Sequence, residues 1–123
     1  MREILLIDDD ECFRGMLFKL LSRNGYAVVA CNDGREGVEL FRKNPEFLVI
    51  TDLIMPGQEG IETILQLLQE FPGVKIIAMS GGGRVAPGIY LDSASCLGAC
   101  RIFVKPFDHG EFLAAVRALT EDT

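Results

Sequence analysis

The sequence lacks any apolar run approaching the ~20 residues that a membrane-spanning helix needs. Histidine is nearly absent too, with one residue in 123 against four cysteines. The cysteines, Cys12, Cys31, Cys96 and Cys100, show no Cys-x-x-Cys spacing. We therefore expect reduced, mostly packed thiols of a cytosolic protein rather than a metal site of the zinc type.

Positive charge is also in short supply, with 12 Lys and Arg against 18 Asp and Glu, a net charge of −6. This balance argues against direct binding of nucleic acid or of an anionic membrane by this segment. The chain enters an apolar run at residues 4–7 and then an acidic run, which is unlike a signal peptide. A cytoplasmic location is expected.

Length and composition predict one globular domain over residues 1–123. Hydrophobic residues make up 49% and charged residues 24% of the chain, as in ordinary soluble domains. No linker, repeat or low-complexity segment interrupts it.

Apolar runs and apolar helical stripes alternate along the chain. The runs predict strands at residues 4–7, 26–30, 47–50, 74–79 and 101–104. The stripes predict helices near residues 13–21, 34–43, 61–71, 87–97 and 108–119. Each connection is long enough for a right-handed parallel crossover. The pattern therefore predicts a doubly wound α/β sandwich with a five-stranded parallel sheet.

The strand order 2-1-3-4-5 is favoured because the second strand precedes the weakest helix and can lie at an edge. That helix contains Gly37, which costs about 1 kcal/mol relative to Ala. The last helix has a well-marked start, with Asp108 and Glu111 in a capping-box pattern and Phe107 and Phe112 as a hydrophobic staple. His109, in its first turn, is expected to be a solvated surface residue.

Asp52 lies in the stretch that organises the chain, residues 48–57, after a run of branched apolar residues and before a Met-Pro-Gly turn. This pattern is typical of a strand buried on both faces that ends at a carboxylate. Taken alone, Asp52 would be a turn former or a helix N-cap.

Parallel strands bring their carboxyl ends to one edge, where open α/β sheets bind ligands. The first strand places Asp8 and Asp9 there, the third Asp52, the fourth Ser80 and the fifth Lys105. Each has an ordinary explanation as a cap, a turn residue or a solvated charge. Three carboxylates in one cleft would repel each other, and a divalent cation removes that conflict. All-oxygen ligation suits Mg²⁺.

With Mg²⁺ these groups suit phosphoryl transfer. Asp52 can act as a carboxylate nucleophile that forms an aspartyl phosphate. Lys105 can supply a positive charge to one phosphoryl oxygen and Ser80 a hydroxyl donor to another. Positioning and charge neutralisation are the main demands of such a transition state.

The chain resembles the receiver domain of two-component response regulators over essentially its whole length. The resemblance rests on an ordered set of short motifs, each weak alone: Leu6-Ile7-Asp8-Asp9-Asp10, Asp33-Gly34-Arg35-Glu36, residues 51–60, Ile77-Ala78-Met79-Ser80-Gly81 and Val104-Lys105-Pro106-Phe107. A chemotaxis receiver is a known example of the expected fold.

The resemblance implies that Asp52 is the phosphoacceptor and that Asp9 and Asp52 bind Mg²⁺ directly. It implies that Asp8 acts mainly through water and that the Ile54 backbone carbonyl completes the protein ligands. Ser80 and Lys105 would contact the phosphoryl group, and the Lys105–Pro106 bond would be cis. The protein would be a switch that catalyses its own phosphorylation and slow dephosphorylation, not a turnover enzyme.

The implied partners are a sensor histidine kinase, whose phosphohistidine is the phosphodonor, and a downstream output domain or protein. Phosphorylation would switch the face formed by the fourth helix, fifth strand and fifth helix. A phosphorylation-dependent dimer is left open.

The chain departs from the family where an aromatic residue normally relays the signal. Ile102 occupies that position, and Phe103 should point to the opposite face of the sheet. We hypothesise that the signal travels through the loop after Ser80 and the following helix. The glycines at 81–83 are more consistent with a hinge than with a phosphate loop.

Two rival functions share some of these features. A Mg²⁺-dependent phosphohydrolase also uses an aspartyl nucleophile, but it needs a second carboxylate two residues later, where Ile54 stands. A flavodoxin-like nucleotide binder needs a phosphate loop after the first strand. There, Asp8 and Asp9 would repel phosphate without a metal.

Overall fold

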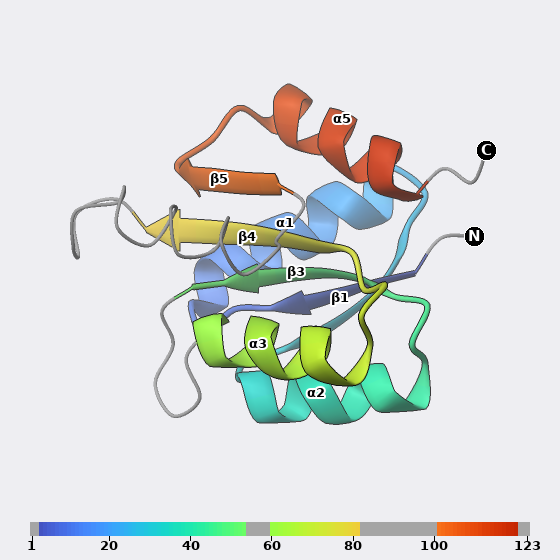
Figure 1. The fold of residues 1–123 in the computed structure, drawn as a ribbon. Coiled ribbons are helices and arrows are strands. Elements are labelled where there is room, and N and C mark those ends of the chain that lie inside the picture. Colours follow the sequence, from blue (N-terminus) through green and yellow to red (C-terminus); the bar gives the residue numbers. More distant parts are fainter. Residues whose placement is uncertain (1–2, 54–59, 82–100, 121–123) are drawn as a thin grey trace.

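Five parallel strands form one sheet in the order β2-β1-β3-β4-β5, as predicted (Figure 1). The computed structural model describes residues 3–53, 60–81 and 101–120. The strands are β1 (Glu3–Ile7), β2 (Ala27–Cys31), β3 (Leu48–Asp52), β4 (Ile76–Gly81) and β5 (Arg101–Lys105). The helices of the described residues are α1 (Glu11–Arg23), α2 (Gly34–Lys43), α3 (Gly60–Glu70) and α5 (His109–Thr120). The helix predicted near residues 87–97 lies outside the described residues.

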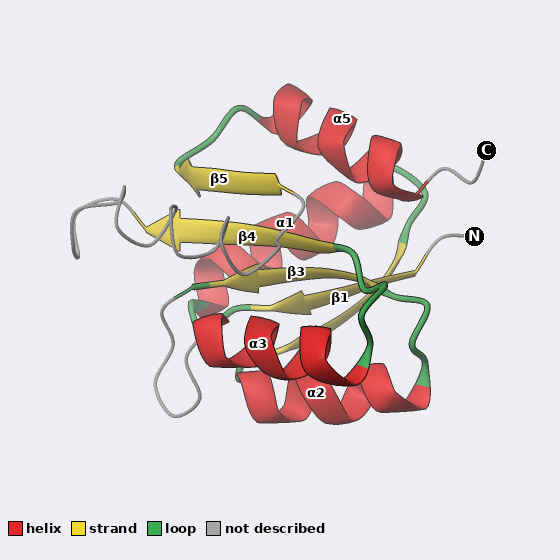
Figure 2. Ribbon diagram, in the orientation of Figure 1, coloured by secondary structure: helices red, strands yellow, loops and turns green. Residues whose placement is uncertain are grey.

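Helices cover both faces of the sheet, with α2 and α3 side by side on one face and α1 and α5 on the other (Figures 1 and 2). Along β1, Leu5 and Ile7 pack into the core under α2 and α3, whereas Ile4 and Leu6 pack under α1 and α5. All four are fully buried. Burial on both faces explains why the interior strands are apolar at successive positions. None of the described helices is long and apolar enough to cross a membrane.

Two of the strands extend beyond their apolar runs. β3 continues to Asp52, which pairs with Met79, and β4 continues to Gly81, which pairs with Lys105. Asp52 thus ends β3, as predicted. The fourth strand was predicted to end at residue 79 because only its apolar run was considered, whereas backbone pairing does not depend on side-chain hydrophobicity. Asp52, Ser80 and Lys105 are therefore held within the sheet, whereas Asp8 and Asp9 directly follow β1.

Gly37 has a packing role that the propensity argument missed. A Cβ atom at this position would overlap the side chain of Ile7 on β1. The glycine therefore lets α2 lie close against the sheet, and its conformational cost is offset by that approach.

The start of α5 confirms the predicted cap and staple. Asp108 Oδ1 accepts a hydrogen bond of 2.8 Å from the backbone N–H of Glu111. The rings of Phe107 and Phe112 stack with their centroids 4.8 Å apart. This arrangement fixes the turn that follows Lys105, in which the Lys105–Pro106 bond is cis.

Candidate functional site

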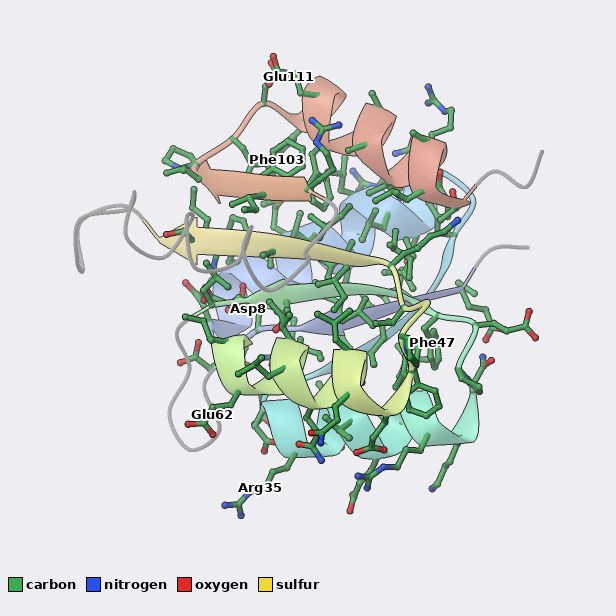
Figure 3. The ribbon with its side chains drawn as sticks, in the orientation of Figure 1. Asp8, Arg35, Phe47, Glu62, Phe103 and Glu111 are labelled. Atoms are coloured by element: carbon green, nitrogen blue, oxygen red, sulfur yellow. The ribbon has the colours of Figure 1, made fainter. Side chains whose placement is uncertain are left out.

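The carboxyl ends of four strands bring one set of polar side chains together. Asp8 and Asp9 follow β1, Asp52 ends β3, Ser80 lies near the end of β4 and Lys105 ends β5. Asp8, Asp52 and Ser80 are at most 5% exposed. Figure 3 labels Asp8 at this edge of the sheet. Burial of several polar groups in one place requires partners among themselves or a ligand.

Asp8 is held by two hydrogen bonds. Its Oδ2 accepts from Lys105 Nζ at 2.8 Å, and its Oδ1 accepts from the backbone N–H of Asp10 at 2.9 Å. Both oxygens of this carboxylate therefore face protein donors.

Lys105 lies between two carboxylates and an aromatic ring. Its Nζ is 2.8 Å from Asp8 Oδ2 and 3.3 Å from Asp52 Oδ2. The same nitrogen lies 4.1 Å from the centre of the Phe13 ring. Only 14% of the lysine side chain is exposed, so its charge acts on these neighbours with little solvent screening.

The acid cluster has the chemistry of a magnesium site. One carboxylate oxygen from each of Asp8, Asp9 and Asp52 lies within 4.8 Å of those of the other two. Within the described residues, Asp9 Oδ1 and Ser80 Oγ are buried without a hydrogen-bond partner. An unpaired buried carboxylate oxygen is costly, and a hard cation would satisfy it. The residues present therefore fit Mg²⁺.

Asp10 belongs to the helix and not to the cluster. Its Oδ1 accepts the backbone N–H of Phe13 at 3.1 Å, which makes it the N-cap of α1. Of the three acidic residues that follow β1, Asp10 is therefore the one that caps the helix. Asp8 instead pairs with Lys105.

Two residues at this site were missed by the sequence reasoning. Arg14 donates a hydrogen bond of 2.7 Å from its guanidinium to the backbone carbonyl of Asp8. Phe13, predicted only as part of an apolar stripe, covers Lys105. Their position in the sequence could have identified them, because both residues lie in the first turn of the helix that follows Asp8 and Asp9.

The end of β2 contributes an inert thiol to the same rim. Cys31 is buried, and its backbone carbonyl accepts a 3.2 Å hydrogen bond from the N–H of Asp8. Burial raises the pKa of the Cys31 thiol to about 12, and the negative charge of Glu36 adds to the effect. Cys31 therefore stays protonated near neutral pH. Cys12, in contrast to the packing expected for most thiols, is exposed.

The predictions for β5 and for His109 are confirmed, whereas several others concern residues that the structure does not describe. Ile102 packs against the core under α2 and α3, whereas Phe103 packs into the opposite core, as expected from their adjacent positions. His109 is exposed, as predicted. Ile54, the glycines after position 81, Cys96 and Cys100 lie outside the described residues.

Comparison with known proteins places the chain in a family. A family model described as the response regulator receiver domain matches residues 4–117. The response regulator MprA of Mycolicibacterium vanbaalenii is 35% identical over 98% of this chain and 51% of that protein. The transcriptional regulatory protein HprR of Escherichia coli is 37% identical over 94% of this chain and 50% of that protein. The chain thus spans about half the length of these relatives.

Solved structures agree with this match. A response regulator receiver domain protein from Clostridium thermocellum has a TM-score of 0.84 and 26% identity, covering 96% of this chain and 93% of that one. A putative response regulator from Chloroflexus aurantiacus has a TM-score of 0.86 and 25% identity, covering 97% of each chain. The sequence, the sheet order and the rim of acids and lysine lead to one conclusion: the chain belongs to the receiver domain family of two-component response regulators, which are signalling switches rather than turnover enzymes.

Proposed function

We propose that this receiver accepts a phosphoryl group on Asp52, with Mg²⁺ bound by the neighbouring carboxylates. The observation that carries the proposal is the convergence of Asp8, Asp9 and Asp52 within 4.8 Å of one another, with Lys105 Nζ bonded to two of the three. The excess negative charge of the three carboxylates attracts a cation, and the bound cation together with Lys105 would offset the negative charge of an incoming phosphoryl group.

In the proposed reaction, a carboxylate oxygen of Asp52 forms a bond to the phosphorus of a phosphohistidine on a sensor histidine kinase. The P–N bond breaks, and the imidazole nitrogen keeps the electron pair and takes up a proton. The products are an aspartyl phosphate and a free histidine. The receiver side chains position the phosphoryl group and neutralise its charge.

Each rim residue has a proposed part in this transfer. Asp9 and Asp52 would hold Mg²⁺ directly, Asp8 through water, and the Ile54 carbonyl would complete the protein ligands. When bound, the cation neutralises phosphoryl oxygen charge as phosphorus is attacked. Lys105 leaves its pairing with Asp52 to contact one phosphoryl oxygen. The Ser80 hydroxyl, buried without a partner among the described residues, donates to another.

A Mg²⁺-dependent phosphohydrolase is the rival function. Such an enzyme would need a second acid or base two residues after Asp52, and that residue is Ile54. An apolar side chain there cannot activate water. Membership of the receiver family further supports the switch.

The discriminating experiment is incubation with Mg²⁺ and acetyl phosphate, followed by intact-mass measurement. We expect one phosphoryl adduct that survives acid, is lost in base, and is absent from Asp52→Asn. Asp10→Asn is the matched control, because Asn also caps helices and Asp10 lies outside the cluster; this variant should label normally. Steady release of phosphate without an adduct would overturn the proposal.

We also propose the wider assignments that the family suggests. Residues 1–123 act as one cytoplasmic receiver unit, which is phosphorylated by a sensor kinase and controls an output domain or partner protein. Its acidic charge makes direct binding to nucleic acid by this domain unfavourable. The output is read from the face that includes β5 and α5, together with the predicted fourth helix. A phosphorylation-dependent dimer is one form of that output.

A further inference from the structure

The ammonium of Lys105 rests on the face of an aromatic ring that belongs to a different helix. Lys105 ends β5 and Phe13 lies in the first turn of α1. The distance from Nζ to the ring centre is 4.1 Å, well within the range of a cation–π interaction. The two carboxylates and this ring together define where the charge sits.

Phe13 is itself fixed from two directions. Its backbone N–H is bound by Asp10, the N-cap of α1. Its ring meets that of Phe107 edge to face, with centroids 5.7 Å apart and an interplanar angle of 89°. The ring therefore has a defined orientation toward Lys105 and does not drift over the surface.

Phe107 connects Phe13 to a group of rings that we call the phenylalanine cluster, consisting of Phe13, Phe103, Phe107 and Phe112. The centroid of the Phe107 ring lies 4.8 Å from that of Phe112, on which it stacks, and 5.4 Å from that of Phe103. The rings of Phe103 and Phe112 are 5.5 Å apart. The cluster joins α1, β5 and α5 in one run of contacts. Phe112 is fully buried and Phe103 is 7% exposed, so displacement of one ring displaces its neighbours.

Phosphorylation of Asp52 would change the forces on the ammonium. The phosphoryl group carries a charge of about −1.5 to −2, more than a carboxylate, and Lys105 would move toward it. That movement takes the cation away from the Phe13 ring, which then loses its electrostatic attraction. The next ring in contact is Phe107, at the turn into α5.

We propose that Phe13 is a positioning residue for Lys105, and that the phenylalanine cluster transmits the displacement of Lys105 to α5. This inference rests on the proposed phosphorylation of Asp52. It gives this chain a route from the site to the β5 and α5 face that does not need an aromatic residue at position 102. It is separate from the route through the segment after Ser80.

The first test is the rate of phosphorylation by acetyl phosphate at saturating Mg²⁺. Phe13→Leu keeps an apolar side chain but removes the ring, so Lys105 no longer gives up the ring's attraction when it moves to the phosphoryl group. This variant should react about three- to tenfold faster. Phe13→Tyr retains the ring face and should react within about twofold of the wild type. Phe18→Leu is the matched control, since Phe18 lies on the same helix, is 40% exposed, and should leave the rate unchanged.

The second test separates coupling from folding. Beryllium fluoride with Mg²⁺ serves as the phosphoryl mimic, and NMR follows the ring signals of Phe112 and the amide signal of Leu53. In the wild type and Phe13→Tyr, both signals should shift on binding. In Phe13→Leu the Leu53 signal should shift while the Phe112 shift is lost. Phe13→Met, of similar volume but without a ring, should repeat the result if Phe13→Leu folds poorly.

The outcomes are distinguishable. A normal rate together with a normal Phe112 shift in both ring-free variants would overturn the role of Phe13 and leave the phosphorylation proposal intact. If the wild type formed no adduct and its Leu53 amide did not respond to the mimic, the proposed function would fail and this inference with it.

Discussion

The guanidinium of Arg14 donates a hydrogen bond of 2.7 Å to the backbone carbonyl oxygen of Asp8, six residues earlier in the chain. The backbone of Asp8 is therefore fastened on both sides, because its N–H donates to the carbonyl of Cys31 at 3.2 Å. A hydrogen bond from a charged donor is stronger than one between neutral groups. This bond ties α1 to the turn that carries the acid pair.

Loss of this bond should loosen the proposed metal site. We expect Arg14→Gln to weaken Mg²⁺ binding by about three- to tenfold and to lower the free energy of unfolding by about 1–2 kcal/mol. Isothermal titration with Mg²⁺ and urea unfolding measure the two effects. Arg14→Lys keeps the positive charge and a hydrogen-bond donor, so its losses of Mg²⁺ affinity and of stability should be smaller. Unchanged Mg²⁺ affinity in Arg14→Gln would contradict a role for Arg14 in ordering Asp8.

Lys105 should oppose the binding of a cation while assisting phosphoryl transfer. Its ammonium lies 2.8 Å from Asp8 Oδ2, where it competes with a metal ion for the same negative charge. Lys105→Gln should therefore bind Mg²⁺ about tenfold more tightly and accept phosphate from acetyl phosphate far more slowly. Metal titration and the rate of adduct formation measure these opposite changes.

The matched control for Lys105 is Lys75→Gln. Lys75 is exposed just before β4, where its Nζ donates to the carbonyl of Leu119 at 3.3 Å. The substitution makes the same change in net charge at the other end of the sheet. Lys75→Gln should keep a Mg²⁺ affinity within about twofold of the wild type, since charges more than a Debye length from the site are screened. An equal gain in Mg²⁺ affinity in Lys105→Gln and Lys75→Gln would mean that net charge alone controls Mg²⁺ binding.

Gly60 sets how closely α3 approaches Asp52. A Cβ atom there would overlap the carbonyl oxygen of Asp52 and lie 2.6 Å from Leu53 Cα. The Gly60 N–H also donates to the carbonyl of Leu53 at 3.1 Å. Gly60→Ala must displace backbone and should destabilise the fold by about 1–3 kcal/mol while weakening Mg²⁺ binding.

Gly15→Ala is the control for this substitution. Gly15 lies within α1, is exposed, and has open space at its Cβ position. Alanine favours a helix over glycine, so the variant should be more stable by about 0.5–1 kcal/mol. Urea unfolding of both variants checks the pair. If Gly60→Ala left the free energy of unfolding unchanged, α3 would be able to move away from β3 without loss of stability.

The arrangement of the sheet could be predicted because a strand buried on both faces leaves a strong signal in sequence. The runs containing Leu5 and Ile50 are apolar at every position. Asp8 directly follows the first run, and Asp52 follows the second after Thr51. Parallel topology then requires those carboxylates to meet at one edge. Asp8, Asp9, Asp52 and Lys105 were brought together by this argument alone, and the structure places them together.

The features that could not be predicted depend on how closely the helices and strands approach one another. Gly37 was interpreted as a weakness of its helix, because propensity scales contain no information on how near Ile7 lies. Phe13 fits an apolar stripe whether its ring meets leucine or an ammonium. Arg14 is one of many charged helix residues, and only the three-dimensional turn shows that it reaches Asp8. Periodicity reports which face of an element is buried, but not what each atom contacts.

Cys31 should make stability depend on alkaline pH. Its thiol has a pKa of about 12 in the folded protein, raised mainly by burial, against roughly 8.5 in an unfolded chain. Above about pH 8.5 the unfolded state releases this proton while the native state retains it, so stability falls as pH rises toward 12. Cys31→Ala removes the effect. Between pH 7.5 and 9.5, urea unfolding should show a smaller loss of stability for Cys31→Ala than for the wild type.

Cys12 provides the internal comparison, because it is exposed on α1 whereas Cys31 is 5% exposed. Cys12→Ala should keep the pH dependence of the wild type. In native protein at pH 8, iodoacetamide should modify Cys12 rapidly and Cys31 only after unfolding, since burial raises the pKa of the Cys31 thiol to about 12 and keeps it protonated there. Peptide mapping by mass spectrometry distinguishes the two sites. Equal modification of both would mean that the end of β2 opens readily, and the rim beside Asp8 would then be less rigid than its hydrogen bonds indicate.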